Sequence, residues 1–399
     1  MAAGRLIERF ERQLKDRGLP LEIVLWNGTT LRGAAPRVRL TLRSPRVLAS
    51  LVNPTMGKLG RHYVEGEMDI DGSPREIIAV GELLSDSEQV LRGRAVRRFF
   101  HHSRHADRKA ISYHYDLSDD FYALWLDRRR VYSCAYFRRE EDTLDAAQEQ
   151  KLDHICRKLR LAPGERLLDI GCGWGALAIW AAQHYGVHAV GITLSENQYN
   201  HGQQLVRELG LGDRVEIRLQ DYRDVPEREP FDKISSIGMF EHVGKANLPV
   251  YFAKISRLLR PGGLTLNHGI TLNLLDRLEL GSGIGQFVED YVFPGGQLMH
   301  VSHVIAEMSR QGLEAWDVEN LRPHYAKTLW HWGDRLEASR EEAIRLVGEK
   351  RFRIWRIYLA GSAHGFDRGW MSLHQILAGK PVAGGALGFP LTRDFIYIP

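Results

Sequence analysis

The residues whose types and spacing best suit chemistry form a glycine-rich loop near the middle of the chain. From Asp169 to Gly175 it reads Asp-Ile-Gly-Cys-Gly-Trp-Gly, between an apolar run typical of a buried strand and a helical segment. Glycines allow the backbone to pass close to a bound molecule. In an open α/β sheet, ligands bind in such loops outside the carboxyl ends of the strands. The loop therefore predicts a cofactor site around Asp169, Gly171 and Gly173.

The spacing of the glycines separates two classes of cofactor. A dinucleotide would require G-x-G-x-x-G, whereas this loop has G-x-G-x-G. The next strand ends at 191–195 without the carboxylate that usually holds a ribose, and Thr193 and Gln198 could supply hydrogen bonds instead. Gln220 and Asp221 end the third strand, where such folds commonly bracket an adenine; an ordinary solvated loop is the alternative there. We therefore expect a nucleoside cofactor such as S-adenosylmethionine.

The elements that must position this loop alternate between strands and helices. Hydrophobic periodicity predicts strands over 166–170, 188–193, 215–219, 233–237 and 264–268, and helices over 144–159, 176–184, 196–209 and 250–258. Strict alternation is typical of a parallel, doubly wound sheet. We predict an α/β, Rossmann-like class I methyltransferase fold over residues 113–399, in which the helix-rich region after 273 covers the sheet.

The first 88 residues differ from the rest in pattern. They begin with a helix, after which we expect strands over 21–25, 38–42 and 64–70 and a helix over 44–51. This order of elements is typical of a small α+β module. We therefore place a domain over residues 1–88, a linker over 89–112 and the catalytic domain after it.

The linker is strongly basic, although the whole chain carries a net charge of only +4. Residues 92–109 contain six Arg and one Lys against one Asp, beside Phe99-Phe100. Such a segment suits either a solvated helix face or the surface of an anionic membrane. Since no recognition motif accompanies the charge, nucleic acid is the least expected partner.

The composition excludes several classes of protein. With 399 residues, 44% of them hydrophobic and 26% charged, the chain is typical of a globular protein of two or three domains. No apolar run approaches the ~20 residues that span a bilayer, and the charged N-terminus lacks the apolar stretch of a secretory signal. Three cysteines are too few for a disulfide framework. We therefore expect a cytoplasmic protein, and we expect no metal site.

Several further motifs occur in order around the loop. They are His114–Ser118 (His-Tyr-Asp-Leu-Ser), Tyr132–Tyr136 (Tyr-Ser-Cys-Ala-Tyr), Gly191–Ser195 (Gly-Ile-Thr-Leu-Ser), Gly238–Gly244 (Gly-Met-Phe-Glu-His-Val-Gly) and Asn267–Ile270 (Asn-His-Gly-Ile). Together they resemble the cyclopropane-fatty-acyl-phospholipid synthases and the related mycolic acid cyclopropane synthases, over about residues 110–380. The N-terminal module resembles the lipid-binding domain of the phospholipid-acting members, which the mycolic acid enzymes lack. This favours a membrane phospholipid as substrate.

The resemblance implies an activity, a location and a set of site residues. A cis double bond of an acyl chain takes the methyl group of S-adenosylmethionine, a bound bicarbonate ion removes a proton from the resulting carbocation, and a cyclopropane ring closes. The positions that match the ion's ligands are Cys134, Glu241, His268, the backbone of Ile270, and Tyr358; those that match cofactor contacts are Tyr132, Ser133, Gly171, Gly173, Thr193 and Gln198. The resemblance also implies peripheral attachment at the inner face of the cell membrane and pairing of two copies.

Two other functions stay open at this point. Loss of a different proton would give a methyl-branched or methylene-branched acyl chain without ring closure, and the proton that is lost depends on how the base is placed. A non-catalytic lipid-binding protein would keep the N-terminal module and the basic linker, but the set of Cys134, Glu241, His268 and Tyr358 argues against it. Taken alone, Cys134 could also be a buried small hydrophobic residue.

Overall fold

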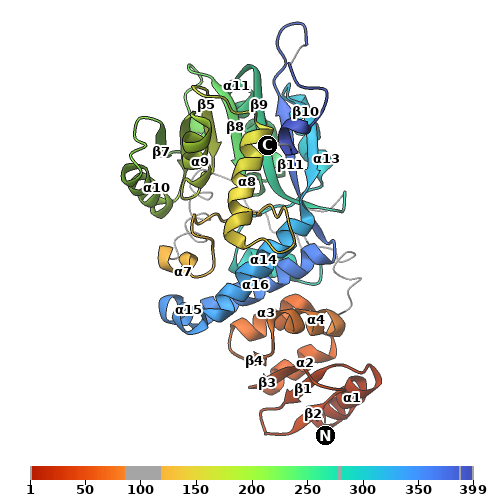
Figure 1. Ribbon diagram of the computed structural model, residues 1–399. Coiled ribbons are helices and arrows are strands. Elements are labelled where there is room, and N and C mark those ends of the chain that lie inside the picture. The colour runs from red at the N-terminus through yellow and green to blue at the C-terminus, as the bar shows by residue number, and fades with distance from the viewer. Residues whose placement is uncertain (1, 86–117, 276–279, 386–387, 398–399) are drawn as a thin grey trace. The chain divides into compact units, whose positions relative to one another are not determined.

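The computed structural model describes residues 2–85, 118–275, 280–385 and 388–397 (Figure 1). The basic linker lies outside these residues, so the structure does not test its predicted role. The chain divides into two compact units, which are Met1–Arg98, Glu279–Pro294 and Trp332–Trp370 for the first and Phe99–Leu278, Gly295–His331 and Met371–Pro399 for the second. The region after residue 273, which we expected to cover the sheet, is therefore divided between the two units. Residues 279–294 and 332–370 group with the N-terminal module, so the units do not follow the expected boundaries at 88 and 113.

A seven-stranded sheet forms the centre of the second unit. Its strands are β5 (Arg166–Ile170), β6 (His188–Thr193), β7 (Val215–Leu219), β8 (Phe231–Ile237), β9 (Leu259–Leu272), β10 (Glu314–Asn320) and β11 (Met371–Gly379). Their order is β10-β11-β9-β8-β5-β6-β7. All pairs from β9 to β7 are parallel, as predicted, whereas β11 is antiparallel to both β9 and β10. Sequence analysis missed β10 and β11.

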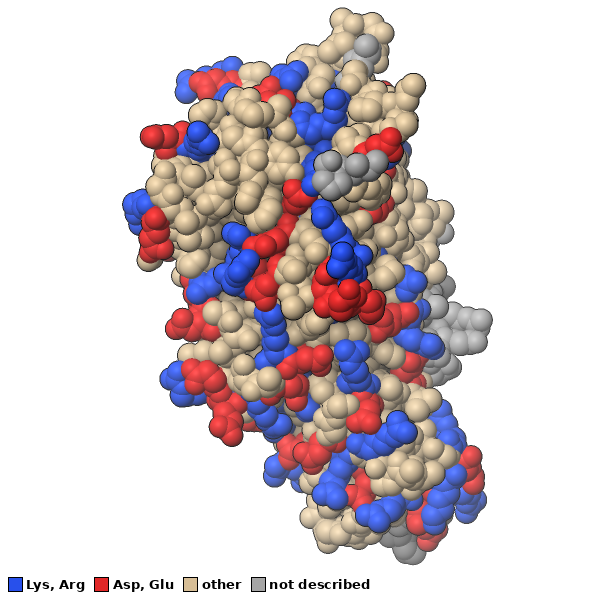
Figure 2. Space-filling view, in the orientation of Figure 1, with Lys and Arg blue, Asp and Glu red and all other residues tan. Residues whose placement is uncertain are grey.

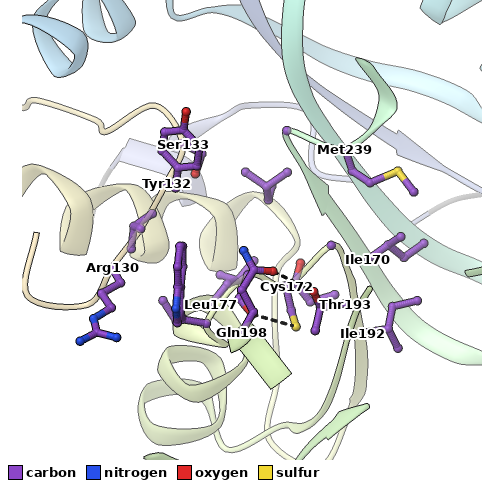
Figure 3. A pocket seen from close by; sticks show the side chains of 18 of the residues that line it. Arg130, Tyr132, Ser133, Ile170, Cys172, Leu177, Ile192, Thr193, Gln198 and Met239 are labelled. Atoms are coloured by element: carbon purple, nitrogen blue, oxygen red, sulfur yellow. Dashed lines mark hydrogen bonds between the residues drawn. The ribbon is translucent and has the colours of Figure 1, made fainter. Parts of the chain in front are cut away.

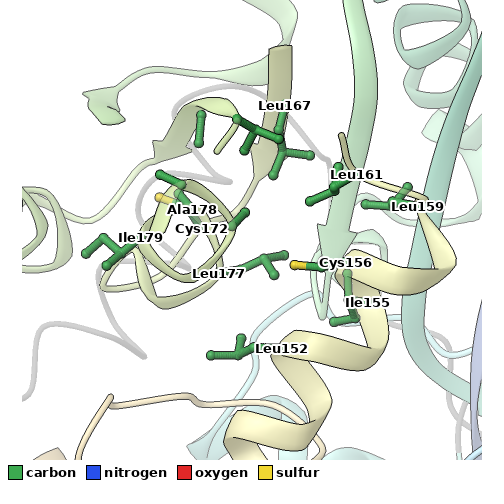
Figure 4. Close-up of a cluster of buried hydrophobic side chains, with 14 of the residues drawn as sticks. Leu152, Ile155, Cys156, Leu159, Leu161, Leu167, Cys172, Leu177, Ala178 and Ile179 are labelled. Atoms are coloured by element: carbon green, nitrogen blue, oxygen red, sulfur yellow. The ribbon is translucent and has the colours of Figure 1, made fainter. Parts of the chain in front are cut away.

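Helices cover both faces of this sheet. They are α8 (Leu144–Lys158), α9 (Ala176–Tyr185), α10 (Glu196–Glu208), α11 (Leu248–Leu258) and α13 (Val301–Arg310), with the shorter α7 (Asp119–Ala123), α17 (Asp394–Tyr397), η1 (Tyr222–Asp224), η2 (Phe240–His242) and η3 (Lys245–Asn247). Neighbouring residues of β5 show the two layers. Leu167 belongs to the same buried cluster as Leu152 of α8 and Leu177 of α9 (Figure 4), whereas Leu168 belongs to a second cluster with Phe252 of α11.

The first unit contains the N-terminal module and helices from the C-terminal part of the chain. Its elements are α1 (Ala2–Asp16), β1 (Leu21–Val24), β2 (Thr30–Arg32), β3 (Val38–Leu42), α2 (Pro45–Val52), α3 (Met56–Val64), β4 (Met68–Asp71), α4 (Pro74–Leu84), α12 (Ile284–Tyr291), α15 (Arg340–Val347), α16 (Glu349–Asp367) and the end of α14 (Arg322–Ala338). The four strands form one sheet in the order β2-β1-β3-β4. The strand predicted from residue 64 begins only at Met68, because Val64 still belongs to α3.

One buried side chain shows why α16 belongs to this unit. The guanidinium of Arg356 on α16 donates to Glu337 of α14, to the hydroxyl of Tyr63, and to the carbonyl oxygens of Ile70 and Gly72. Separating these groups would leave a buried charge without partners, which is costly. A polar network therefore connects segments nearly 300 residues apart in the sequence.

Charges of both signs are intermixed over the face of the molecule shown in Figure 2. Within the four described stretches of the chain, the structure contains no helix that is both long and apolar enough to span a bilayer.

Candidate active site

A cavity in the second unit lies at the carboxyl ends of β5, β6 and β8 (Figure 3). Eight of the predicted cofactor residues line it, namely Tyr132, Ser133, Asp169, Gly171, Gly173, Thr193, Gln198 and Gln220. They come from the segment before α8, the end of β5 and the loop after it, the end of β6 with the start of α10, and the residue after β7. The fold thus brings together residues spread over about 90 positions of the sequence.

The glycine-rich loop after β5 has the tight backbone expected of it. Gly171 and Gly173 have φ angles of +77° and +56°, a region that residues with a Cβ rarely adopt. The backbone N–H groups of Gly171 and Cys172 both donate to the carbonyl oxygen of Ile192, at 2.9 and 3.0 Å. The loop is therefore fixed to the end of β6 before it enters α9.

The end of β6 carries the polar pair predicted in place of a ribose carboxylate. The hydroxyl of Thr193 donates to Oε1 of Gln198 at 2.8 Å (Figure 3). Ser195 begins α10 as its N-cap, accepting from the N–H of Gln198. The side chains of Thr193 and Gln198 are buried and line the cavity, and their contact with a ribose stays a prediction.

The two residues predicted at the end of β7 differ from each other. Gln220 lines the cavity, and its amide nitrogen donates to the carbonyl oxygen of Asp224. Asp221 is not among the lining residues, because its carboxylate caps η1 and accepts hydrogen bonds from Arg223. The structure therefore turns the Asp221 carboxylate to Arg223, whereas its neighbours Gln220 and Tyr222 line the cavity.

Two buried charged groups line the same cavity. Asp169 accepts a hydrogen bond from Ser235 at 2.7 Å, and its burial raises its pKa to about 6. Lys151 on α8 donates to the hydroxyl of Ser133 at 2.9 Å, and its burial lowers its pKa to about 8. Sequence analysis missed Lys151, although its position one turn from both Ala147 and Ile155, on the apolar side of the helix predicted over 144–159, was a signal that could have found it.

Glu241 and His268 lie beside the cavity. Gly238 connects them to it, because Gly238 lines the cavity and its N–H donates to the carbonyl oxygen of His268. The carboxylate of Glu241 accepts the N–H of Ile270 at Oε1, at 2.7 Å. Burial raises the pKa of Glu241 to about 7, and this hydrogen bond opposes the shift. Ile270 therefore holds Glu241 in place through its backbone.

His268 lies on β9, and its partner lies on β11. The amide nitrogen of Gln375 donates to Nδ1 of His268 at 3.2 Å, which leaves the proton of a neutral ring on Nε2. Burial lowers the pKa of His268 well below its usual value, and the charges of Lys151 and Lys158 add to this effect. Among the described residues, neither Nε2 of His268 nor Oε2 of Glu241 has a hydrogen-bond partner.

The other two residues predicted with this set lie on different elements. Cys134 is fully buried before α8, its thiol donates to the carbonyl oxygen of Ala135, and burial raises its pKa. The charges of Lys151 and Glu319 shift the pKa of both Cys134 and His268, so both lie within electrostatic reach of the same groups. Tyr358 lies on α16 in the first unit, and its place in the set stays a prediction.

Residues 102–376 match the family described as mycolic acid cyclopropane synthetase. A protein of Pseudomonas putida named as a probable fatty acid methyltransferase is 47% identical over 385 residues, which cover 96% of this chain and 98% of that protein. The chain belongs to this family. The prediction made from its motifs is therefore confirmed.

A further sequence match and a solved structure from the mycolic acid cyclopropane synthetase family support the same conclusion. Cyclopropane mycolic acid synthase 1 of Mycobacterium tuberculosis is 40% identical over 278 residues, covering 68% of this chain and 96% of its own length. A crystal structure of mycolic acid cyclopropane synthase CmaA1 complexed with SAH and CTAB has a TM-score of 0.64 and 38% identity, covering 68% of this chain and 98% of that one. The predicted class I methyltransferase fold is confirmed.

The glycine-rich loop of this protein packs closely against Gly191 of β6, and this packing can be tested by its effect on stability. A Cβ on Gly191 would lie 2.9 Å from the sulfur of Cys172 and 2.9 Å from Cδ1 of Ile217. Gly191→Ala should therefore lower the free energy of unfolding by about 1–3 kcal/mol, the usual cost of overpacking, measured by chemical denaturation.

Gly212→Ala is the matched control, because a Cβ there meets no atom within 4 Å. Adding Cys172→Ala to Gly191→Ala should recover part of the lost stability. Equal stability of the Gly191 and Gly212 variants would contradict the packing described for the loop.

Proposed function

We propose that this protein transfers a one-carbon unit from S-adenosylmethionine to the cis double bond of an unsaturated phospholipid acyl chain and closes a cyclopropane ring. The observation that carries the proposal is the buried pair of Glu241 and His268 beside the cavity. Each has a polar atom that meets no partner within the described residues. Burying such atoms costs free energy, which favours a site over a purely structural role.

S-adenosylmethionine would supply the electrophilic methyl group when it is bound. Its proposed place is the cavity at the carboxyl ends of β5, β6 and β8, and the solved relative complexed with SAH, at 38% identity, supports this. An alkene is a weak nucleophile, so the protein must hold donor and acyl chain in contact and keep water out. The buried Trp174 and Leu177 and the half-buried Tyr132 supply apolar surface to that cavity.

The residues around Glu241 fit a small anion such as bicarbonate, which would supply the base when bound. His268 presents the proton on Nε2 as a donor, because Nδ1 is engaged with Gln375. Glu241, with a pKa of about 7, can accept a proton from a hydroxyl of the anion through its free Oε2. The N–H of Ile270, predicted as a ligand of the ion, donates to Glu241 in the structure and so contributes by holding that carboxylate. We propose that Cys134 and Tyr358 complete the set.

The same transfer without ring closure is the second candidate. The relative from Pseudomonas putida, which matches 96% of this chain and therefore includes the N-terminal module, is named a probable fatty acid methyltransferase. Loss of a proton from a carbon of the acyl chain, and not from the new methyl group, would give a branched chain. A third reading, a lipid-binding protein without activity, leaves the buried polar atoms of Glu241 and His268 unexplained.

The central test mixes the purified protein with S-adenosylmethionine and vesicles of a cis-monounsaturated phospholipid. The acyl chains are recovered and examined by mass spectrometry and by nuclear magnetic resonance. We expect one added CH₂ per chain and cyclopropane protons in the spectrum. Vesicles of a saturated phospholipid are the control. A methyl or methylene branch would establish the second candidate, and no added carbon would refute the lipid assignment.

The role of Glu241 predicts a pH dependence. Because the ionised carboxylate accepts the proton, turnover should fall as pH decreases through about 7, the pKa to which burial raises this group. Glu241→Gln should lower turnover by at least about 100-fold, as expected when general base catalysis is lost. The affinity for S-adenosylhomocysteine, measured by calorimetry, should change little.

Glu208→Gln, which alters an exposed carboxylate on α10, is the control for the Glu241 variant. It should keep both the wild-type rate and the wild-type pH profile. Unchanged turnover in the Glu241 variant would remove this residue from the mechanism.

We also propose that the protein acts at the inner face of the cell membrane, with the basic segment 92–109 against anionic lipid headgroups; pairing of two copies stays a prediction. The initial rate on vesicles should rise with the fraction of anionic lipid and fall with salt, since the Debye length is about 10 Å at 0.1 M. Arg97→Gln with Arg98→Gln should weaken this dependence. A rate that does not depend on vesicle charge would contradict the proposed contact between segment 92–109 and the lipid headgroups.

A further inference from the structure

Lys151 is unusual among the buried lysines of this protein. Lys158, Lys233 and Lys254 each have a carboxylate near Nζ, at 2.6, 3.6 and 2.8 Å. Lys151 is only 2% exposed, and its Nζ donates to the neutral hydroxyl of Ser133. In the described part of the chain no carboxylate oxygen lies within 4.0 Å of this ammonium. The buried carboxylates of Asp127 and Asp169 stabilise this ammonium only from a longer distance. A buried charge without a counter-ion in contact is costly, so a ligand that supplies one is expected.

Asp169 carries the opposite charge at the same cavity. It is 2% exposed and is held by the hydroxyl of Ser235, and none of the described Lys or Arg side chains lies within 4.0 Å of it. Lys151 and Asp169 both line the cavity and stabilise each other's charge over a longer distance. The cavity therefore contains one buried cation and one buried anion that do not pair directly.

A zwitterion is the chemical complement of such a pair of charges. S-adenosylmethionine contains one α-amino acid group, whereas its adenosine is neutral and its sulfonium is a cation. We infer that Lys151 binds the carboxylate of this aminoacyl end, with the ammonium of the same group facing Asp169. A hydrogen bond between two charged groups is about twice as strong as one between neutral groups.

The neighbours of Lys151 on α8 suit this role. Gln148, one helical turn before it, donates to the carbonyl oxygens of Val131 and Ser133 at 3.3 and 2.9 Å. The segment before α8 is thereby fixed along the helix. Because the hydroxyl of Ser133 accepts from Lys151, its own proton is available to a ligand. Lys151 and Ser133 together form a donor pair for a carboxylate.

The alternative is a purely structural role, in which Lys151 only holds Ser133 in place. The experiment must distinguish this role from binding of the cofactor carboxylate. The inference rests on the proposed function for the identity of the cofactor, but it does not depend on the acyl substrate. Three ligands distinguish the readings: S-adenosylhomocysteine, its decarboxylated analogue, and 5′-methylthioadenosine, which lacks the aminoacyl end. Isothermal titration calorimetry measures the affinity of each one for the full chain.

Lys151→Met should weaken S-adenosylhomocysteine by about 10- to 100-fold, as expected for the loss of one charged hydrogen bond. It should leave the affinities for the decarboxylated analogue and for 5′-methylthioadenosine within about twofold. Lys151→Arg, which keeps the charge, should restore part of the affinity for S-adenosylhomocysteine. Lys233→Met is the matched control, since it removes a buried lysine that does not line the cavity, and all three affinities should stay unchanged.

A loss shared equally by the three ligands, or no loss for S-adenosylhomocysteine, would overturn the inference in favour of the structural role. The wild-type chain gives a test that needs no variant. It should bind S-adenosylhomocysteine at least about 10-fold more tightly than the decarboxylated analogue, and equal affinities would overturn the inference. Binding that behaves as expected, together with no transfer to lipid, would refute the proposed function and leave this inference standing.

Discussion

The hydrogen bond from the backbone of Ile270 to the carboxylate of Glu241 is the contact on which the proposed chemistry depends. It joins η2, which follows β8, to the neighbouring strand β9, at a distance of 2.7 Å. One carboxylate oxygen is held by this bond, and the other is left for a ligand. Because β8 and β9 are parallel, their carboxyl ends meet at one edge of the sheet, where the cavity also lies.

Strands β10 and β11 place further polar residues beside His268 of β9. In the strand register, Glu319 of β10 faces Gln375 of β11, and Gln375 faces His268 of β9. Side chains that face each other across a sheet lie on the same side of it. Gln375 orients His268, while Glu319 binds His154 and Lys158 from α8. The strands missed from the sequence therefore supply the groups that orient the proposed anion site.

Helix α8 contributes a row of buried polar residues that faces the cofactor cavity at one end and the surroundings of His268 at the other. Gln148, Lys151, His154 and Lys158 follow one another at intervals of three or four residues and are each at most 2% exposed. This spacing places them along one side of the helix. The row begins at the segment that contains Ser133 and ends at Glu319. One helix thus contacts both the cofactor cavity and the surroundings of His268.

The sequence by itself determined the glycine-rich loop, the alternation of strands and helices around it, and the family. These features are local, since periodicity and glycine spacing report the environment of neighbouring residues. The tertiary structure decided that β10 and β11 join the sheet, that α16 packs with the N-terminal module through Arg356, and that the carboxylate of Asp221 pairs with Arg223. It also decided that Lys151 has no carboxylate beside it in the described chain. The partners of a buried charge come from segments distant in sequence, so only the folded chain shows which of them are present.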